Sequence, residues 1–300
     1  MMHGLLSVWC DKSDASEPRY SAAPSRRLAR CAGVVLLLSC LWAHPVLAEN
    51  ILWERLSDGL AVSVWKPGEA CPSVPAMLAA DIDPERARFF VHYYAQEGLS
   101  QPPTIQEWQK RTNHHVLFNA GLFRENFAYL GLLYKDGRSL GSRRHTSWQG
   151  LFVAEPATSG SKRARVLDLA SEGFDEQQPS YREAAQSLML LDQAGKIRVR
   201  LTGKHSYQTI VAETQNGHIL VLKSLDPVTL YDLGQCLKDA LPEVRQAMAM
   251  DGGSSSDVLV AESLWQEHKP AGDRLSWKSW FGGNAATHIP LPAVIGISPR

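Results

Sequence analysis

Short β-strand segments account for most of the regular structure that this chain can form. Nine segments after residue 58 are rich in β-branched or aromatic residues and end at Gly, Pro, Asp or Asn, which is typical of strands bounded by turns. These segments are 60–65, 76–80, 87–94, 115–119, 150–153, 187–191, 197–201, 207–213 and 219–222. The pattern predicts a sheet protein.

Two other segments have the signals of α-helices. Residues 104–112 begin at Thr104 and carry Glu107 three positions later, the pattern of a capping box. Residues 229–241 repeat leucine at helical spacing and stop before a proline, which cannot continue a helix. No repeat or low-complexity segment divides the chain. We therefore expect an α+β fold of mixed, largely antiparallel sheets with a few flanking helices in a single domain.

One apolar segment ends in an acid, two glycines and three serines, in the stretch AMAMDGGSSS at 247–256. Residues 247–250 predict a buried strand with Asp251 at its end, and the glycines permit positive φ and close approach by a ligand. Backbone N–H groups and hydroxyls in such a turn can bind an anionic oxygen. A flexible surface turn is the alternative interpretation. The turn residues expected to contact substrate are Gly252, Gly253, Ser254 and Ser255.

The same stretch resembles the DGGGSS signature of the phosphodiester glycosidase family. Further segments resemble family elements in the expected order: NAGLF at 119–123, the hairpin GLLYKDGRSLG at 131–141, and the strand, turn and strand TIVAETQNGHILVL at 209–222. The resemblance covers roughly residues 58–298. This chain departs from the family pattern in two places. Ser254 replaces a third glycine, and an arginine expected near Tyr207 or Gln208 is absent.

The resemblance implies a hydrolase that cleaves the glycosidic bond of a sugar-1-phosphodiester. A phosphate monoester leaves readily as an anion, so this reaction depends less on a general acid than ordinary glycoside hydrolysis does. It still needs a carboxylate to activate water or to trap the oxocarbenium-like centre, and donors to hold the phosphate. Asp251 is the first candidate catalytic carboxylate. Glu213 is the second, because it ends a predicted strand one hairpin upstream.

Two clusters of basic residues are candidates for binding the phosphate. Arg143, Arg144 and His145 follow the predicted hairpin, and guanidinium groups suit phosphate oxygens. A solvated charged surface is the alternative interpretation. Lys204 and His205 form the second cluster, which would supply the cation missing near Tyr207.

The NAGLF motif contributes two further candidate substrate ligands, Asn119 and Gly121. Because the motif directly follows a predicted strand, Asn119 is expected either to hydrogen-bond a sugar hydroxyl or to brace the Asp251 loop. The alternative is that Asn119 only caps local backbone.

No motif in the chain requires a cofactor. The sequence has no HExxH, CxxC or Gly-x-Ser-x-Gly. Asp251 with serine and backbone oxygens would suit a hard cation, so Ca²⁺ or Mg²⁺ is the metal to consider, with its ligands unassigned. The tryptophan-rich segment 264–281 is interpreted either as a lid that offers aromatic rings to a sugar or as aromatics that close the edge of the core.

Residues 1–48 have the features of a signal peptide. Three arginines precede an apolar run at 31–43, and the small residues at 46–48 fit a cleavage site. The apolar run is too short to span a bilayer comfortably. We therefore expect a mature domain at 49–300 that is exported to the periplasm or secreted, with no stable membrane span. A twin-arginine signal or lipid attachment at Cys40 is ranked below plain secretion.

Removal of the leader changes the charge and the cysteine count of the chain. Five basic and three acidic residues leave, so the formal net charge falls from 0 to −2. A chain of this charge is not expected to bind nucleic acid. Cys71 and Cys236 are the cysteines that remain, and in an oxidising compartment we expect them to form a disulfide.

Two classes of function are consistent with these features. The favoured one is an exported hydrolase, a phosphodiester glycosidase that acts on a carbohydrate or sugar-phosphodiester of an envelope or extracellular glycan. The alternative is a non-catalytic envelope protein that binds glycan or assists exopolysaccharide biosynthesis with the same fold. An ordinary O-glycosidase is a third possibility.

Overall fold

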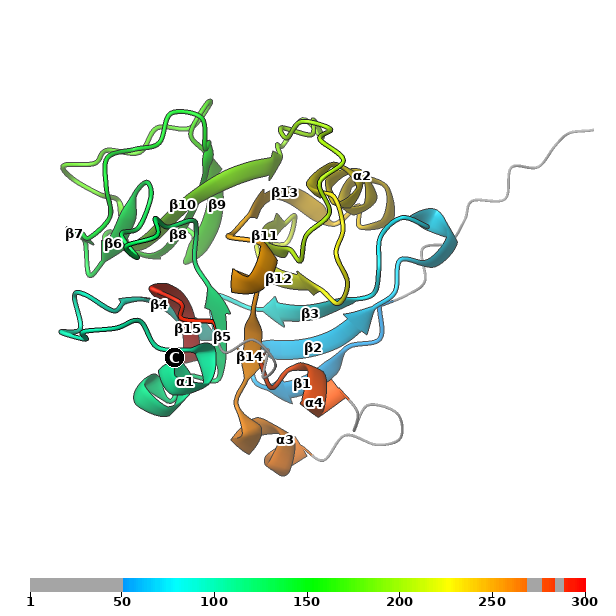
Figure 1. Cartoon of the computed structure of the whole chain (residues 1–300), viewed down its shortest axis with the longest axis horizontal. Helices are drawn as coiled ribbons and strands as arrows, with labels where there is room; N and C mark the ends of the chain where they lie inside the picture. Colours follow the sequence, from blue (N-terminus) through cyan, green and yellow to red (C-terminus); the bar gives the residue numbers. More distant parts are fainter. Residues whose placement is uncertain (1–50, 269–276, 284–288) are drawn as a thin grey trace, which may run out of the picture. The chain divides into compact units, whose positions relative to one another are not determined.

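The computed structural model describes residues 51–268, 277–283 and 289–300 (Figure 1). All of these residues belong to one compact unit, Pro45–Arg300. The predicted signal peptide and the site of its cleavage lie outside the described residues. Every strand pair in the described part of the chain is antiparallel, and few helices accompany the sheets. The predicted α+β class with largely antiparallel sheets is therefore confirmed, whereas a mixture of parallel and antiparallel pairs is not found there.

The larger sheet has the strand order β1-β2-β3-β12-β11-β13-β10-β6-β7, and β8 and β9 branch from β10. Its strands are β1 Glu54–Ser57, β2 Leu60–Trp65, β3 Met77–Ile82, β6 Leu133–Lys135, β7 Arg138–Ser139, β8 Gly150–Pro156, β9 Ala164–Asp168, β10 Tyr181–Leu191, β11 Thr209–Thr214, β12 Ile219–Ser224 and β13 Val244–Ala249. Strands β11 and β13, which precede the candidate site, lie in the middle of this order.

The smaller sheet has the order β14-β5-β15-β4. Its strands are β4 Ala87–Tyr93, β5 Val116–Asn119, β14 Val258–Val260 and β15 Ala293–Pro299. The helices of the described chain are α1 Ile105–Thr112, α2 Leu230–Ala240, α3 Glu262–His268 and α4 Trp277–Trp280. Two short 3-10 turns are also present, η1 Gly68–Ala70 and η2 Gly253–Ser255. Helix α1 packs beside the small sheet and α2 beside β10 and β13 (Figure 1).

Both predicted helices form where their capping residues place them. The Thr104 hydroxyl accepts the Glu107 N–H, and the Glu107 carboxylate accepts the Thr104 N–H, so the predicted capping box is present. Helix α2 starts after Thr229, whose side chain accepts the Asp232 N–H. Its C-cap is Leu241, directly before the proline.

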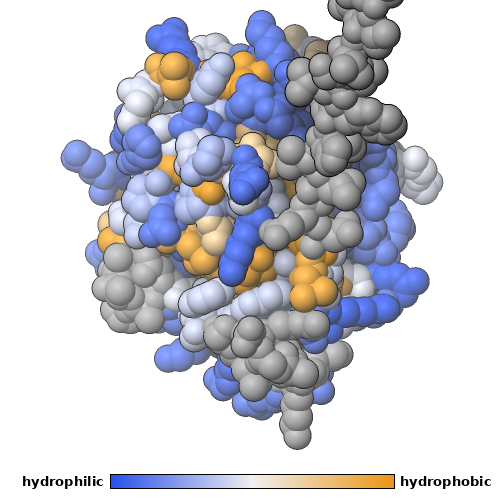
Figure 2. Space-filling view, turned by 90° about the vertical axis from the view of Figure 1, so that its right-hand side faces the viewer, coloured by the Kyte–Doolittle hydropathy of each residue, from blue (hydrophilic) through white to orange (hydrophobic). Residues whose placement is uncertain are grey.

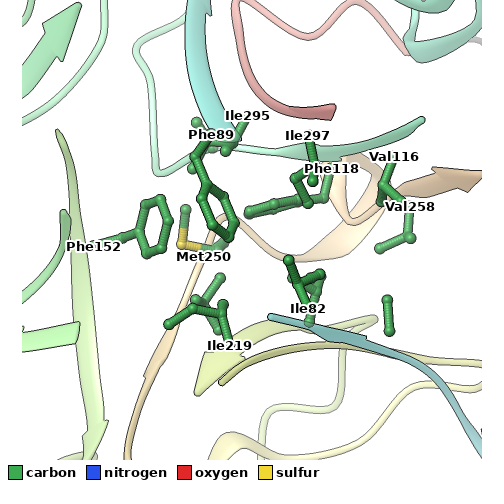
Figure 3. Close-up of a cluster of buried hydrophobic side chains, with 14 of the residues drawn as sticks. Ile82, Phe89, Val116, Phe118, Phe152, Ile219, Met250, Val258, Ile295 and Ile297 are labelled. Atoms are coloured by element: carbon green, nitrogen blue, oxygen red, sulfur yellow. The ribbon is translucent and has the colours of Figure 1, made fainter. Parts of the chain in front are cut away.

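A buried apolar cluster between the sheets fixes the end of β13 (Figure 3). Met250, the residue before Asp251, is 2% exposed and lies among side chains that include Phe89, Phe152 and Ile219. The other face of β13 packs with α2 in a second cluster. Because β13 is buried on both faces, its end is a rigid platform for the residue that follows.

A disulfide joins Cys71, next to η1, to Cys236 on α2, with the Cα atoms 5.5 Å apart. The predicted pairing is therefore confirmed. The bond links two segments separated by 165 positions in the sequence and holds α2 beside η1.

The prediction of a strand at 197–201 is wrong. Only an isolated bridge forms there, between Ile197 and Leu191. Arg198 instead pairs with Asp168, with 2.6 Å between Nη1 and Oδ2, and the chain beyond it runs as an exposed loop. The ion pair joins the segment to the end of β9, a tertiary contact that local β-propensity does not contain.

Hydrophilic residues predominate over the face shown in Figure 2, and apolar residues occur there singly or in small groups. The large exposed apolar side chains of the described residues are Leu52, Leu201, Tyr207 and Trp280. Among the helices that the structure describes, none has the length and apolar character needed to cross a bilayer.

Candidate active site

A cleft of about 740 Å³ opens where β13 ends. Three segments line it: the turn from Met250 to Gly253, the loop from Arg198 to Ser206, and the segment Ser147–Gln149. The floor includes apolar side chains such as Met189. Asp251 supplies the only carboxylate among the described residues that line this cleft.

The backbone of Asp251 is held from two sides. Its N–H donates to the Ala120 carbonyl at 3.2 Å, and its own carbonyl accepts the Asn119 side-chain amide at 2.7 Å. The preceding N–H, that of Met250, donates to the Thr209 carbonyl at 2.8 Å. None of these bonds uses the Asp251 carboxyl group, and Asp251 is one of the residues that line the cleft.

Burial raises the pKa of the Asp251 carboxyl group to about 6, although hydrogen bonds from the Ser255 hydroxyl and the Gly252 N–H and the nearby charge of Lys204 act to lower it. The carboxyl group is therefore largely ionised at neutral pH while being more basic than an ordinary aspartate. A carboxylate with these properties is suited to activate water or to attack an electrophilic carbon.

The two glycines of the turn are needed for different reasons. Gly253 has φ +72°, which L side chains rarely adopt. A Cβ on Gly252 would lie 2.9 Å from both the Gln208 Oε1 and the Tyr207 carbonyl oxygen. The Gly253 N–H donates to the same Tyr207 carbonyl at 2.8 Å, and the Gly252 N–H is directed to Asp251. Both N–H groups therefore have partners within the protein, and the expected anion site at this turn stays a prediction.

The serines of the turn also separate into two environments. Ser255 is 7% exposed and hydrogen-bonds the Asp251 carboxylate, so it supports the acid. Ser254 is exposed and is not among the residues that line the cleft. Its expected contact with substrate has no support in this geometry.

Asn119 braces the turn, which is one of the two roles expected for it. Its side chain is 2% exposed. The Oδ1 atom accepts the Thr209 hydroxyl at 2.8 Å and the Asp257 N–H at 2.9 Å, while Nδ2 donates to the Asp251 carbonyl. All three contacts are internal, so Asn119 fixes the position of Asp251 and does not face the cleft.

Gly121 is also a packing residue. A Cβ there would lie 2.4 Å from both the Tyr129 hydroxyl and the Gln186 carbonyl oxygen. Its N–H donates to the Tyr129 hydroxyl at 3.0 Å. The motif therefore needs glycine for close approach, and the expected substrate contact at Gly121 is not found.

The structure does not bring Glu213 to the cleft, which corrects its expected pairing with Asp251. Glu213 lies five residues beyond Gln208, on the order of 16 Å along an extended strand. Its side chain is 0% exposed, and Oε1 accepts Lys162 Nζ and Arg245 Nη1, each at 2.8 Å. Burial acts to raise the pKa of Glu213, but Lys162 and Arg165 outweigh it and hold the pKa below its ordinary value.

Three of the basic residues expected to bind phosphate do not line the cleft. Arg143 is exposed and does not line the cleft. Arg144 pairs with Glu176, with 3.3 Å between Nε and Oε1. The His205 Nδ1 lies 3.0 Å from the carbonyl oxygen of Gly203 in its own loop. None of these three residues is among the described residues that line the cleft, so the cleft geometry does not support their expected contact with phosphate.

The cationic side chains of the cleft come from the loop that begins at Arg198. Arg198, Arg200 and Lys204 line the cleft beside Asp251. Arg198 already pairs with Asp168, whereas Arg200 and Lys204 belong to an exposed loop. The second basic cluster of the sequence thus supplies Lys204, but Arg200 was missed. The sequence signal for Arg200 was its position, two residues after Arg198, in the segment 197–201 that we assigned to a strand.

The described parts of the tryptophan-rich segment contribute Trp265 and Phe281 to the core, whereas Trp280 is 43% exposed, and the interpretation of the whole segment as a lid stays untested. Trp265 and Phe281 are buried with ring centroids 5.9 Å apart. Residues 269–276 lie outside the described structure. The aromatic residue of the cleft is Trp148, which no sequence pattern indicated.

Among the described residues, no three His, Cys, Asp or Glu side chains come together as metal ligands do. The carboxylate of Asp251 has serine and backbone partners within the turn. The expectation of Ca²⁺ or Mg²⁺ at this position is untested and stays a prediction.

Comparison with known families identifies the class of protein to which this fold and cleft belong. The family model described as phosphodiester glycosidase matches residues 112–282, which is more than half of the chain and includes Asp251. The chain therefore belongs to the phosphodiester glycosidase family. No curated protein sequence matches it.

Solved structures of other proteins share the fold. A hypothetical protein from Synechocystis is similar at TM-score 0.57 and 11% identity, over 84% of this chain and 64% of that one. This chain thus spans less than two thirds of that protein. The catalytic domain of zebrafish N-acetylglucosamine-1-phosphodiester α-N-acetylglucosaminidase, auto-inhibited by its pro-peptide, is similar at TM-score 0.50 and 15% identity, over 75% of this chain and 77% of that one.

Proposed function

We propose that this chain is an exported hydrolase that cleaves the glycosidic bond of a sugar-1-phosphodiester in an envelope or extracellular glycan. Family membership supports the reaction class. The observation that carries the proposal is the cleft itself, where Asp251 is the sole carboxylate among the described lining residues and cationic side chains lie beside it.

A single carboxylate favours a phosphodiester over an ordinary glycoside as the substrate. Ordinary glycoside hydrolysis uses two carboxyl groups, one of which protonates the leaving oxygen. A phosphate monoester needs no such proton, because it leaves as a stabilised anion. Asp251 supplies the negative charge that activates water or meets the oxocarbenium-like centre, and Arg200 and Lys204 would hold the phosphate.

The competing function is a glycan-binding or exopolysaccharide accessory protein with the same cleft. Turnover of the purified chain on a panel of sugar-1-phosphodiesters, beside matched aryl glycosides, distinguishes the two. The proposed enzyme releases sugar and phosphate monoester from at least one phosphodiester. Binding of the panel with no turnover would favour the accessory protein.

Substitution of the cleft cations tests the phosphate site. Because a hydrogen bond to a charged group contributes about 1.5–3 kcal/mol, Arg200→Ala or Lys204→Ala should raise KM for a phosphodiester by about tenfold or more. KM for an uncharged aryl glycoside should change less than about threefold. The matched control is Arg143→Ala, an exposed arginine outside the cleft, which should alter neither value. Equal effects on both substrates would show that the loop has only a structural role.

A further inference from the structure

A stacked pair of rings lies at the edge of the cleft. The His145 and Trp148 rings are nearly parallel, at 14°, with centroids 3.8 Å apart. Trp148 is half-buried and lines the same cleft as Asp251. Because the imidazole covers one face of the indole, the indole meets the cleft through the surface that the imidazole leaves uncovered.

One buried amide fixes the segment that carries this pair. Gln186 is 0% exposed. Its Oε1 accepts the His145 N–H and the Leu132 N–H, each at 3.0 Å, and its Nε2 donates to the His145 carbonyl at 2.8 Å and to the Trp148 carbonyl. All four hydrogen-bonding positions of the amide are therefore used, and both ring-bearing residues are tied to β10.

The same strand is connected to the candidate catalytic acid. The Gln186 backbone carbonyl accepts the Tyr129 hydroxyl at 2.8 Å, and that hydroxyl accepts the Gly121 N–H. Gly121 directly follows Ala120, whose carbonyl accepts the Asp251 N–H. The backbones of Trp148 and Asp251 are thus connected through one buried hydrogen-bonded network.

We propose that Trp148 forms an aromatic subsite of the cleft that binds the apolar C–H face of a pyranose ring, with His145 supporting the indole from behind. The inference rests on the proposed function for its choice of a sugar as ligand. The cleft provides two kinds of surface: cations at Arg200 and Lys204 for the phosphate, and a rigid indole beside Met189 and Leu188 for an uncharged ring. An indole whose ring is already held in place binds a flat ligand without losing side-chain freedom.

Neutral methyl glycosides test this subsite separately from phosphate binding and from catalysis. The purified protein is titrated by calorimetry with methyl glycosides of N-acetylglucosamine, glucose, galactose and mannose, and with inorganic phosphate. For the methyl glycoside that binds best, Trp148→Ala should weaken affinity by about tenfold, and Trp148→Phe should stay within about threefold of wild type. Affinity for inorganic phosphate should not change. The control variant is Trp280→Ala, which removes a 43% exposed tryptophan outside the cleft and should leave affinity for the methyl glycoside unchanged.

The outcomes separate this inference from the proposed function. If Trp148→Ala folds and binds every methyl glycoside as wild type does, the subsite is refuted even when phosphodiesters are hydrolysed. The subsite is refuted equally if wild type binds none of the glycosides. If affinity for a methyl glycoside depends on Trp148 but no phosphodiester is hydrolysed, the subsite stands and the proposed hydrolase fails.

Discussion

An Asp251→Asn variant should fold as wild type does and lose about three orders of magnitude or more in kcat. Asparagine keeps the size of the side chain and one oxygen to accept the Ser255 and Gly252 hydrogen bonds, while the backbone contacts of Asp251 do not involve the carboxylate. Only the charge is removed. The measurement is kcat on a phosphodiester substrate, with circular dichroism to verify the fold.

The pH profile of the wild type provides a second readout for the same residue. Asp251 is protonated below its pKa of about 6 and ionised above it. Since the ionised form acts, kcat/KM should rise with pH through about 6 and then level off, and residual activity of Asp251→Asn should lack this rise. A wild-type profile that falls through pH 6 would instead make Asp251 a general acid and contradict the proposed role.

The raised pKa of Asp251 makes stability change with pH in the opposite direction from activity. A carboxyl group whose pKa is higher in the folded state favours folding when protonated, so its contribution is lost as pH rises through about 6. Above that pH the Asp251→Asn variant should be at least as stable as wild type. Thermal unfolding at pH 5 and pH 8 measures this. A variant much less stable than wild type at pH 8 would mean that the lost activity reflects misfolding.

Glu213→Ala should lower the free energy of unfolding by about 2–4 kcal/mol and leave kcat nearly unchanged. The substitution removes a fully buried carboxylate that accepts Lys162 and Arg245, together with the Val166 N–H at 3.2 Å. These donors would lose their partner. The estimate lies toward the low end for buried pairs because the Lys162 side chain is 47% exposed and can return to solvent. Denaturant unfolding beside steady-state kinetics measures both quantities.

Glu213→Gln is the matched variant, and its pH dependence has a definite sign. Since the folded pKa of Glu213 is lowered, its ionised form stabilises the fold above the ordinary pKa, and that contribution is lost as pH falls through the lowered folded value. The stability difference between wild type and Glu213→Gln should therefore shrink in acid. A large loss of kcat without loss of stability would make Glu213 a candidate catalytic residue again.

Local sequence signals predicted the parts of the fold that depend on local chemistry. The capping box at Thr104 and Glu107 places α1 correctly, because both partners lie within one turn. The prediction of a strand at 197–201 was wrong, and the contact that the segment makes there, between Arg198 and Asp168, joins residues 30 positions apart. Strand β15 was not predicted at all, although it lies between β4 and β5 in the small sheet.

The same distinction between local signals and contacts of distant residues explains which site residues the sequence indicated. Asp251 and its glycines are adjacent in sequence, so an apolar strand followed by an acid and a tight turn was sufficient to predict them. Glu213 was placed wrongly because β11 and β13 pair in the antiparallel direction, so the start of β11, and not the end that carries Glu213, lies beside the end of β13. Trp148 was missed because Gln186, which positions it, lies 38 residues away.

Hydrolysis in ¹⁸O-labelled water tests the central claim most directly. The purified chain is incubated with the phosphodiester that it turns over best, and the released phosphate monoester is examined by ³¹P NMR and mass spectrometry. Water that attacks the anomeric carbon breaks the sugar C–O bond, so the account predicts a phosphate monoester with no ¹⁸O and a sugar that is free at its anomeric carbon. Incorporation of ¹⁸O into the phosphate would show cleavage of the P–O bond and would contradict a glycosidase mechanism at Asp251.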